Sequence, residues 1–375
     1  MAAISNALII GGGFSGMSAA IQLRKVGVDV DLIEIDPGWR SYGAGITLAG
    51  LTLRALGAVG VLAEVVAQGA CCDGAEIYTA QGHKLGDLVT PRLAGPNIPG
   101  GGGIMRPTLA KILSAATRKS GTQIRLGCRV TAITPVQNGV DVETSDGSRK
   151  VYDLVVAADG ANSSTRQMVF PDAPTPKYTG QGVWRALVPR PKMVERPSFY
   201  LGARLKAGVN PVSASEMYLF LTEDRPENKY VEESQLLPDL RILLAEFTAP
   251  VPAYVQSVLD KDSHIVFRPL EAMLLPQPWY RGRIVVIGDA AHASTPHLAS
   301  GAGMGVEDAV VLTEEVQGAD SISEALERFQ IRRLPRCRLV VENSVRLGEL
   351  EQTNGSKDEH AELMRGSMIA LAAPY

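Results

Sequence analysis

The first 35 residues constrain the fold more than any other stretch of this chain. An apolar run at residues 7–10 leads into residues 11–16, GGGFSG, which fit the pattern G-x-G-x-x-G and precede apolar residues at helical spacing. A second apolar run, residues 28–35, contains Glu34, 18 residues after Gly16. Glycines let a backbone approach a pyrophosphate, a helix N-terminus faces it, and a carboxylate at this spacing accepts hydrogen bonds from a ribose. The stretch therefore predicts a dinucleotide-binding strand–helix–strand unit.

Two further apolar runs, both typical of buried strands, end in Asp159-Gly160 and in Gly288-Asp289. After the second run, Pro296 argues against a helix through the loop, because proline lacks a backbone N–H donor. Residues 301–305, GAGMG, then leave the backbone bare just before an apolar pattern that predicts a helix. The free amides of such a helix start favour an anionic or electron-rich group.

Length and composition exclude several classes of protein. With 375 residues, the chain is long enough for roughly two domains. The formal net charge is -3 and no block of Lys and Arg is present, which argues against a nucleic-acid partner. The four cysteines and five histidines show no metal-ligand spacing, and no apolar stretch reaches membrane-spanning length. We therefore expect a cytoplasmic protein with reduced thiols, no bound metal and no membrane partner.

The order of the motifs closely resembles that of the single-component FAD-dependent aromatic hydroxylases, whose fold is that of p-hydroxybenzoate hydroxylase. The motifs are GGGFSG with Glu34, then Asp159-Gly160 in AADGANSSTR, then Gly288-Asp289 in GDAAHASTP, and the resemblance covers nearly the whole chain. Similar enzymes include salicylate, urate and hydroxynicotinate monooxygenases. The resemblance implies tightly bound FAD, hydride transfer from NADH or NADPH, and insertion of one atom of dioxygen into an electron-rich ring through a flavin hydroperoxide. Only one dinucleotide fingerprint is present, which fits transient docking of the nicotinamide co-substrate.

We therefore expect an oxidoreductase of the α/β class: an FAD-dependent NAD(P)H monooxygenase that hydroxylates a small, anionic aromatic or N-heteroaromatic substrate, as a monomer or homodimer. A Rossmann-like FAD-binding domain should comprise residues 1–72, 98–175 and 270–340. A β-sheet substrate domain, residues 73–97 and 176–269, should be inserted into it, and residues 341–375 should form a C-terminal helical segment. The glycine run at 99–103 predicts a mobile loop, and Pro335 predicts an interruption in a long helix that the capping-box pattern at 321–324 opens.

The resemblance also implies which residues contact FAD. The glycines of the first motif would face the pyrophosphate, Glu34 the adenosine ribose, Asp289 the ribityl chain, and Pro296 with the amides of 301–303 the isoalloxazine ring. Arg40 and Arg106 match cofactor-contacting arginines of the family, the backbone of Val130 matches an adenine contact, and Asp159 matches a position implicated in FAD and nicotinamide binding. The expected cofactor-binding residues are Gly11, Gly13, Phe14, Ser15, Gly16, Glu34, Ile35, Arg40, Gly45, Arg106, Val130, Asp159, Asp289, Pro296, Gly301, Ala302 and Gly303. Two positions depart from the family pattern, which often has glycine three residues and asparagine seven residues after the proline; here they are Ala299 and Gly303. These departures bear on the geometry of the loop and on oxygen activation.

Substrate-binding candidates come from the inserted domain. Arg185 and Arg204 are suited to pair with a carboxylate. The run RLKAGVNPVSASEMY resembles a segment of the urate-type enzymes, with Arg204 or Lys206 and Tyr218 at the substrate-contacting places. Solvated strand arginines and a packed tyrosine are the alternative interpretation of the same residues.

Hydroxylation of a phenol requires its phenolate, but a free phenol has a pKa near ~10, so a base or a positive field is needed. Tyr218 and His297 are the candidates for the base, and Pro296 completes the expected catalytic group beside the flavin. His292 is expected to have a structural role, with its ring tied to the backbone.

Other functions use the same cofactor motifs, because these motifs bind FAD and not the substrate. One alternative is epoxidation, Baeyer–Villiger insertion or the modification of a larger tailoring scaffold. Another is a flavin-binding protein without oxygenase activity, which Ala299 keeps open.

Overall fold

A six-stranded sheet forms the centre of the nucleotide-binding part of the molecule. The computed structural model describes residues 4–41 and 43–375. In spatial order the strands are β18 (Tyr280–Arg281), β19 (Ile284–Val286), β12 (Leu154–Ala157), β1 (Asn6–Ile10), β2 (Asp29–Glu34) and β8 (Gln123–Leu126). All neighbouring pairs are parallel except β18–β19. Strands β12 and β19 are fully apolar and buried, and β1 is so after its first residue, Asn6, as expected for parallel strands covered on both faces.

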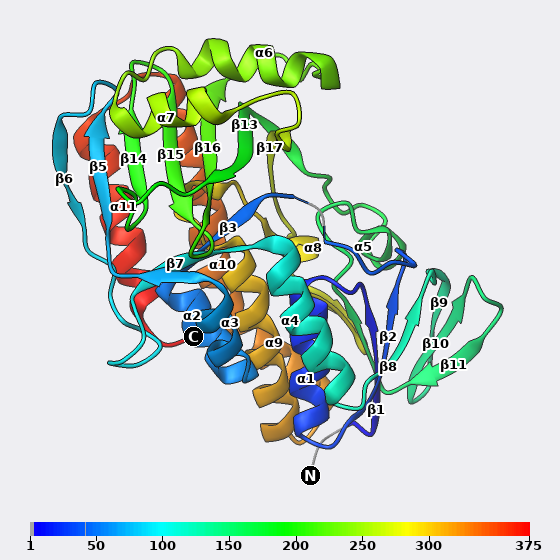
Figure 1. Cartoon of the computed structure of the whole chain (residues 1–375). Coiled ribbons are helices and arrows are strands. Elements are labelled where there is room, and N and C mark those ends of the chain that lie inside the picture. The colour runs from blue at the N-terminus through cyan, green and yellow to red at the C-terminus, as the bar shows by residue number, and fades with distance from the viewer. Residues whose placement is uncertain (1–3, 42) are drawn as a thin grey trace.

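Helices cover this sheet and supply the rest of its core. Helix α1 (Phe14–Lys25) connects β1 to β2, and α4 (Arg106–Lys119) and α9 (Gly301–Gly318) lie beside it (Figure 1). The C-terminal part of the chain forms α10 (Ile322–Gln352) and α11 (Lys357–Ala372), and α10 packs along α9. The α/β class, the Rossmann-like sheet and the C-terminal helices are therefore confirmed.

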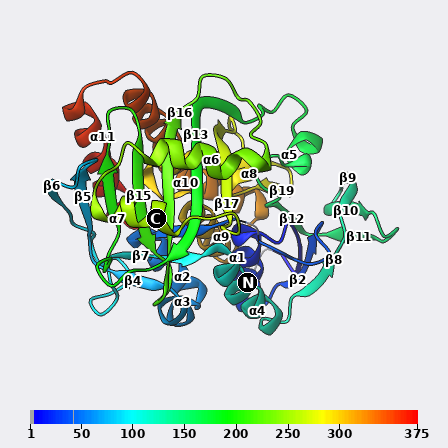
Figure 2. The same cartoon turned by 45° about the horizontal axis from the view of Figure 1, so that its top comes forward.

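The inserted part is a seven-stranded sheet with helices on one face. Its strands, in spatial order, are β17 (Ile265–Leu274), β13 (Lys177–Pro189), β16 (Glu216–Asp224), β15 (Lys206–Pro211), β14 (Ser198–Leu201), β5 (Ala75–Thr79) and β6 (Lys84–Leu88). Helices α6 (Glu233–Leu244) and α7 (Pro250–Val258) lie across its outer face, which Figure 2 turns toward the viewer. Trp184 and Ala186 of β13 pack with these helices, whereas Leu187 packs with Tyr218 on the inner face. The exact boundaries of the substrate domain stay a prediction, and β17 extends past residue 269.

A small sheet separates the two parts and corrects one expectation. Strand β7 (Gly101–Met105) lies between β3 (Gly45–Ala49) and β4 (Ala70–Cys72), so the predicted mobile loop is wrong for these glycines. A side chain at Gly103 would place its Cβ 2.3 Å from the carbonyl oxygen of Pro211. The glycines therefore allow β7 to approach β15 closely, a tertiary requirement that composition alone does not reveal.

The remaining elements are short or peripheral. They are α2 (Gly50–Val59), α3 (Leu62–Gln68), α5 (Ser164–Val169), α8 (Asp289–His292), the 3-10 turn η1 (Pro296–Leu298) and the three-stranded sheet of β9 (Val130–Val136), β10 (Gly139–Thr144) and β11 (Arg149–Tyr152). Within the described ranges, no helix has the length and apolar character needed to cross a membrane.

The long C-terminal helix is continuous through Pro335, so the predicted interruption is wrong. Pro335 is exposed, and water can bond the carbonyl that loses its intrahelical partner, while buried residues on both sides hold α10 against α9. The expected cap is present: the Ser321 hydroxyl accepts a hydrogen bond from the Glu324 N–H at 3.2 Å.

Candidate active site

The three sequence motifs meet at one edge of the parallel sheet. Strands β1, β12 and β19 are neighbours, with Ile10 beside Ala157 and Ala157 beside Val286. Because the strands are parallel, the loops that follow them leave from the same edge, which is where open α/β sheets bind ligands. Residues 11–16, 159–166 and 288–303 therefore surround a common site.

Each glycine of the first motif has a separate geometric task. Gly11 has a φ of +104°, and a Cβ there would lie 2.4 Å from the Ala158 carbonyl oxygen. A Cβ on Gly16 would lie 2.0 Å from the Gly11 carbonyl oxygen, so this position needs glycine for the close packing of α1 on β1. At Gly13 a Cβ would have no atom within 4 Å, so the backbone faces open space there. This is the pattern expected of a pyrophosphate loop.

The carboxylate of Glu34, the last residue of β2, is held in one position by backbone amides. One oxygen of Glu34 accepts a hydrogen bond from the Gly12 N–H at 2.6 Å, and the other accepts from the Asp36 N–H at 2.8 Å. Arg40 is exposed and bonds Asp36 through its side chain at 3.0 and 3.1 Å. These contacts fix the carboxylate and leave its remaining lone pairs for a ligand.

A cavity of about 120 Å³ opens beside this carboxylate, and Trp39 lines it. The indole Nε1 of Trp39 donates a hydrogen bond to the Gly12 carbonyl at 2.8 Å. The backbone of Trp39 has a φ of +46°, which is rare for a residue other than glycine. The Arg118 guanidinium lies 5.0 Å from the centre of the Trp39 ring. No motif pointed to Trp39, and an aromatic residue just after the acidic strand end is the only hint in the sequence.

Other expected adenosine contacts lie at the end of β2. Val130 is buried, and the nearby Cys128 N–H bonds the Glu34 carbonyl at 2.9 Å. Ile35 is 66% exposed, so a large apolar side chain faces solvent beside Glu34. The structure thus brings Val130 and Ile35 to the end of β2, and their contact with FAD stays a prediction.

The second motif is a rigid turn tied to the third. Asp159 accepts from the Ser163 hydroxyl and from the Thr165 N–H, so its carboxylate caps the turn before α5. Arg166 is buried, and its guanidinium donates to the carbonyls of Ala161 and Ala290 at 2.9 Å each. Arg166 therefore connects the loop after β12 to α8, a role that its place in AADGANSSTR did not reveal.

The third motif presents an exposed carboxylate from a buried turn. Gly288 has a φ of +62°, and the residues around it are buried, but Asp289 is exposed. The Ser15 side chain fills the space between two glycines, because a Cβ would lie 2.3 Å from Ser15 Oγ at Gly288 and 2.0 Å at Gly305. The loop of residues 11–16, the Gly288-Asp289 turn and α9 are thus packed into one unit, and Asp289 is exposed at its surface.

The loop before α9 explains both departures from the family pattern. Ala299 adopts a φ of +49°, so the backbone takes the left-handed conformation that glycine would favour, with an alanine in place. A Cβ on Gly303 would lie 2.3 Å from Thr52 Oγ1, so an asparagine does not fit against α2 here. Pro296 is exposed, and Gly301 and Ala302 begin α9 without a side-chain cap.

These features fit both the diphosphate and the flavin of an FAD molecule. The open backbone at Gly13 and the uncapped start of α1 suit the diphosphate, and the uncapped start of α9 suits the electron-rich edge of a flavin. When bound, FAD supplies the redox chemistry, while the protein supplies binding, orientation and exclusion of water. The fold and these three loops together define a flavin-dependent oxidoreductase.

Comparison with known proteins specifies the family. A family model described as FAD binding domain matches residues 5–344. The chain is 34% identical over 348 residues to 2-heptyl-3-hydroxy-4(1H)-quinolone synthase of Pseudomonas aeruginosa, covering 92% of this chain and 89% of that protein. It is 28% identical over 351 residues to Aurachin C monooxygenase/isomerase of Stigmatella aurantiaca, again covering 92% and 89%. The crystal structure of HpxO of Klebsiella pneumoniae with FAD and uric acid superposes with a TM-score of 0.82 at 24% identity, covering 98% of this chain and 92% of that one.

The chain therefore belongs to the family of single-component FAD-dependent aromatic hydroxylases, as the order of its motifs predicted. It is an FAD-dependent monooxygenase.

The inner face of the large sheet carries the substrate-binding candidates that lie nearest these loops. Arg185 stands opposite Phe220 in the β13–β16 pair, and Tyr218 lies two residues from Phe220 on the same face. The Tyr218 hydroxyl bonds Thr47 Oγ1 at 2.6 Å, and a Cβ on Gly45 would lie 2.1 Å from the Tyr218 ring. Tyr218 thus packs directly on the cofactor-binding part of the chain.

Arg106 lies between the two parts. Its guanidinium carbon lies 5.6 Å from the centre of the Phe14 ring at the start of α1. Burial lowers the pKa of Arg185, Tyr218 opposes this shift, and Arg106 and Arg268 add to it. Arg106, Arg185 and Arg268 therefore lie close enough for their charges to interact.

The other candidates lie elsewhere. Arg204 has a side chain that is 63% exposed and pairs with Asp224 at 2.9 Å. Lys206 pairs with Glu351 of α10, and the buried ring of His297 lies 3.3 Å from the same carboxylate. His297 Nδ1 also bonds Thr295 Oγ1 at 2.8 Å. These contacts favour structural roles for the three residues, and their roles toward substrate stay predictions.

Proposed function

We propose that this monooxygenase uses NADH or NADPH and dioxygen to hydroxylate an electron-rich N-heteroaromatic ring that binds as an anion. FAD supplies the redox and oxygen chemistry when bound. The remaining task of the protein is to hold the ring beside the flavin and to stabilise its negative charge.

The observation that carries this proposal is the lack of a polar partner for the Arg185 side chain among the described residues. Among residues 4–41 and 43–375, none gives the Arg185 side chain a hydrogen bond or an ion pair. Arg185 is half-buried, so its charge has lost part of its hydration without gaining a counter-charge, and Arg106 and Arg268 add repulsion. A carboxylate or enolate oxygen of a substrate would relieve both costs with a charge-assisted hydrogen bond.

Tyr218 is the second residue that we assign to the substrate. Its hydroxyl shares a hydrogen-bond chain with Thr47 Oγ1, which accepts from Asn210 Nδ2 at 2.9 Å. Asn210 therefore supplies a donor to Thr47, so the Thr47 hydroxyl is available to donate to the Tyr218 oxygen. In that arrangement, the Tyr218 proton points away from Thr47 and can be given to or taken from a ring hydroxyl.

A second substrate class is a larger bicyclic ring with an apolar chain. A groove of about 500 Å³ lies between β17 and the start of α6, and apolar side chains such as Val266, Phe267 and Leu236 line it together with the charged Lys229, Glu233 and Arg268. An apolar chain would remove the apolar side chains from water, at about 25 cal/mol per Å² buried. The quinolone synthase of Pseudomonas aeruginosa, with a heptyl group in its name, is consistent with this class.

The test is substrate-stimulated oxidation of NADH or NADPH by the FAD-loaded protein. The panel should contain urate, hydroxypyridine carboxylates, 4-quinolones with and without an alkyl chain, and neutral analogues of each ring. We expect an anionic member to stimulate oxidation and to yield a hydroxylated product by mass spectrometry. A yellow protein that no member of the panel stimulates would instead support a flavin-binding protein without oxygenase activity.

Arg185→Met should raise the KM for the anionic substrate roughly 10- to 100-fold, because a hydrogen bond to a charged group contributes about 1.5–3 kcal/mol. Arg204→Met is the matched control, since it removes an arginine of the same domain that is exposed and already paired. Equal effects of the two substitutions on KM would contradict the role of Arg185.

A further inference from the structure

A buried carboxylate lies directly behind the turn that presents Asp289. Asp308 of α9 is 0% exposed, and its Oδ2 accepts from the Gly288 N–H at 2.8 Å. The same oxygen lies 2.6 Å from His292 Nε2, at the end of α8. Its other oxygen accepts from Arg333 Nε at 2.8 Å. Asp308 thus holds both ends of the short helix that begins at Asp289, and His292 is tied to a side chain, not to the backbone as expected.

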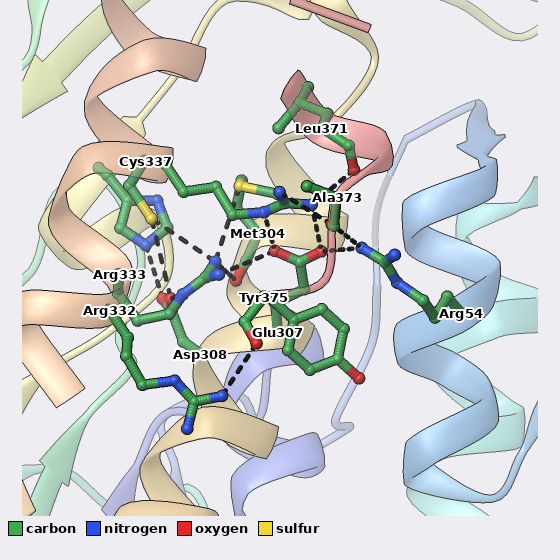
Figure 3. Close-up of polar contacts among 12 residues, drawn as sticks. Arg54, Met304, Glu307, Asp308, Arg332, Arg333, Cys337, Leu371, Ala373 and Tyr375 are labelled. Atoms are coloured by element: carbon green, nitrogen blue, oxygen red, sulfur yellow. Dashed lines mark hydrogen bonds and ion pairs between the residues drawn. The ribbon is translucent and has the colours of Figure 1, made fainter. Parts of the chain in front are cut away.

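The neighbouring carboxylate makes a different set of contacts. Glu307 is also 0% exposed and accepts from Arg333 Nη1 at 2.9 Å and from Arg336 Nε at 2.8 Å. Figure 3 shows Glu307 turned toward Arg54 and the C-terminal segment, with Arg333 between the two acids. Two adjacent buried acids therefore share one arginine, but only Asp308 bonds the Gly288 turn.

Cationic side chains already occupy the contacts of the two acids in this cluster. The ligand atoms of His292, Asp308 and Cys337 all lie within 4.8 Å of one another, a spacing that a metal could use. The Arg333 guanidinium already contacts two of them, with Nε on Asp308 and Nη2 3.6 Å from Cys337 Sγ. Burial acts to lower the pKa of His292, but Cys337 and Asp308 hold it well above its ordinary value. Two cations thus already face the Asp308 carboxylate.

We propose that Asp308 is a positioning residue for FAD, which acts by fixing the Gly288 turn and α8 so that Asp289 faces the cofactor. The inference rests on FAD binding and on the expected contact of Asp289, and it does not depend on the substrate. No other hydrogen bond from a side chain reaches the Gly288 N–H among the described residues. A change at Asp308 therefore alters the direction of Asp289 without touching the ligand.

The test compares Asp308→Asn with Glu307→Gln in FAD titrations of the apo-protein, followed by flavin fluorescence. An amide has one acceptor oxygen, so Asp308→Asn cannot serve Gly288, His292 and Arg333 together. We expect its FAD dissociation constant to rise about tenfold or more, as for the loss of a charge-assisted hydrogen bond. Glu307→Gln also weakens a buried arginine contact, but its dissociation constant should stay within about twofold of the wild type.

A double-substitution cycle separates positioning from general stability. If Asp308 acts through Asp289, then Asp308→Asn should have little further effect on FAD affinity in an Asp289→Ala background. The visible circular dichroism of bound flavin at saturating FAD should also change in Asp308→Asn and not in Glu307→Gln. Full additivity, or equal affinity loss in the two single variants, would overturn the proposal.

His292→Leu provides the same test if Asp308→Asn does not fold. It removes one of the three donors to Asp308, because leucine has no polar atom, and leaves Gly288 and Arg333 in place. We expect a smaller rise of the FAD dissociation constant, about threefold, in the same direction, and an unchanged constant would count against the proposal. A wild-type protein that binds FAD but oxidises no substrate would remove the proposed hydroxylation and leave this inference standing.

Discussion

At the scale of single residues, Ala299 holds a backbone conformation that alanine rarely adopts. Its φ of +49° lies in the left-handed region, which costs a residue with a side chain of the order of 1 kcal/mol or more. The loop before α9 therefore takes, with an alanine in place, the conformation that a glycine at this position would favour. The alternative without oxygenase activity therefore gains no support from the backbone of this loop.

Ala299→Gly should stabilise the protein by about 0.5–1 kcal/mol, because glycine removes the strain but loses more entropy on folding. Chemical denaturation of the apo-protein measures this change. Ala302→Gly, three residues later in the first turn of α9, is the control and should destabilise by a similar amount. A loss of stability in Ala299→Gly would show that the left-handed conformation is not strained.

The residues of the candidate site differ in whether their neighbours in the sequence reveal their roles. Gly11, Gly13 and Gly16 could be predicted with separate tasks, because the turn, the open backbone and the close helix packing all arise within one motif. Asp308 and Glu351 could not, because they act through contacts between separate elements: Gly288 lies 20 residues from Asp308, and Lys206 lies 145 residues from Glu351. An isolated acidic residue in a helix also has no distinctive pattern.

At the scale of elements, one carboxylate joins three parts of the fold. Glu351 of α10 pairs with Lys206 at the start of β15, lies 3.3 Å from His297 in η1, and lies 3.3 Å from His360 in α11. Burial acts to raise the pKa of Glu351, but Lys206 and the two histidines hold it well below its usual range. The two sequence candidates Lys206 and His297 thus meet at a residue that no motif had marked.

Glu351→Gln should therefore lower stability near neutral pH, by roughly 2 kcal/mol, and the difference from wild type should shrink in acid. The unfolded carboxyl titrates near 4.5 and the folded one lower, so the stabilisation is complete above 4.5 and is lost as the pH falls toward the folded pKa. Urea denaturation at pH 7, 5 and 4 measures this. Glu349→Gln, at an exposed pair with Arg346, should change little at any of these pH values.

Errors in predicting the elements share a physical cause. Local patterns placed β1, α1 and β2 correctly, because the 2- and 3.6-residue periods lie within the segment. The strand β7 and the unbroken α10 were missed, because Gly103 and Pro335 are decided by what lies next to them, the Pro211 carbonyl in one case and solvent in the other. The surroundings of the residue override its local preference at both positions.

At the scale of the whole molecule, the candidate cofactor site is built from segments far apart in sequence. Residues 11–16, 159–166 and 288–303 converge because β1, β12 and β19 are neighbours, and Ser15 locks the first segment between Gly288 and Gly305. A ligand that contacts all three segments stabilises only the folded arrangement. Binding and global stability should therefore be tightly coupled.

Added FAD should raise the unfolding free energy of the apo-protein by about 2.7 kcal/mol at a free concentration of 100 times the dissociation constant. Thermal unfolding followed by circular dichroism measures the shift. FMN, which lacks the adenosine half, should give a smaller shift at the same concentration, because it leaves Glu34 and its cavity without a partner. Equal shifts with both flavins would contradict the assignment of this cavity to the adenosine end.

The Glu351 contact has a consequence for protein engineering. Chimaeras that graft the large sheet of a homologue onto this scaffold are a natural route to new substrates. Unless the donor brings a cation at the position of Lys206, such a graft would leave Glu351, a largely buried anion beside the loop of Pro296, without its lysine partner. Crossover points should therefore be chosen so that β15 and the end of α10 are inherited from the same parent.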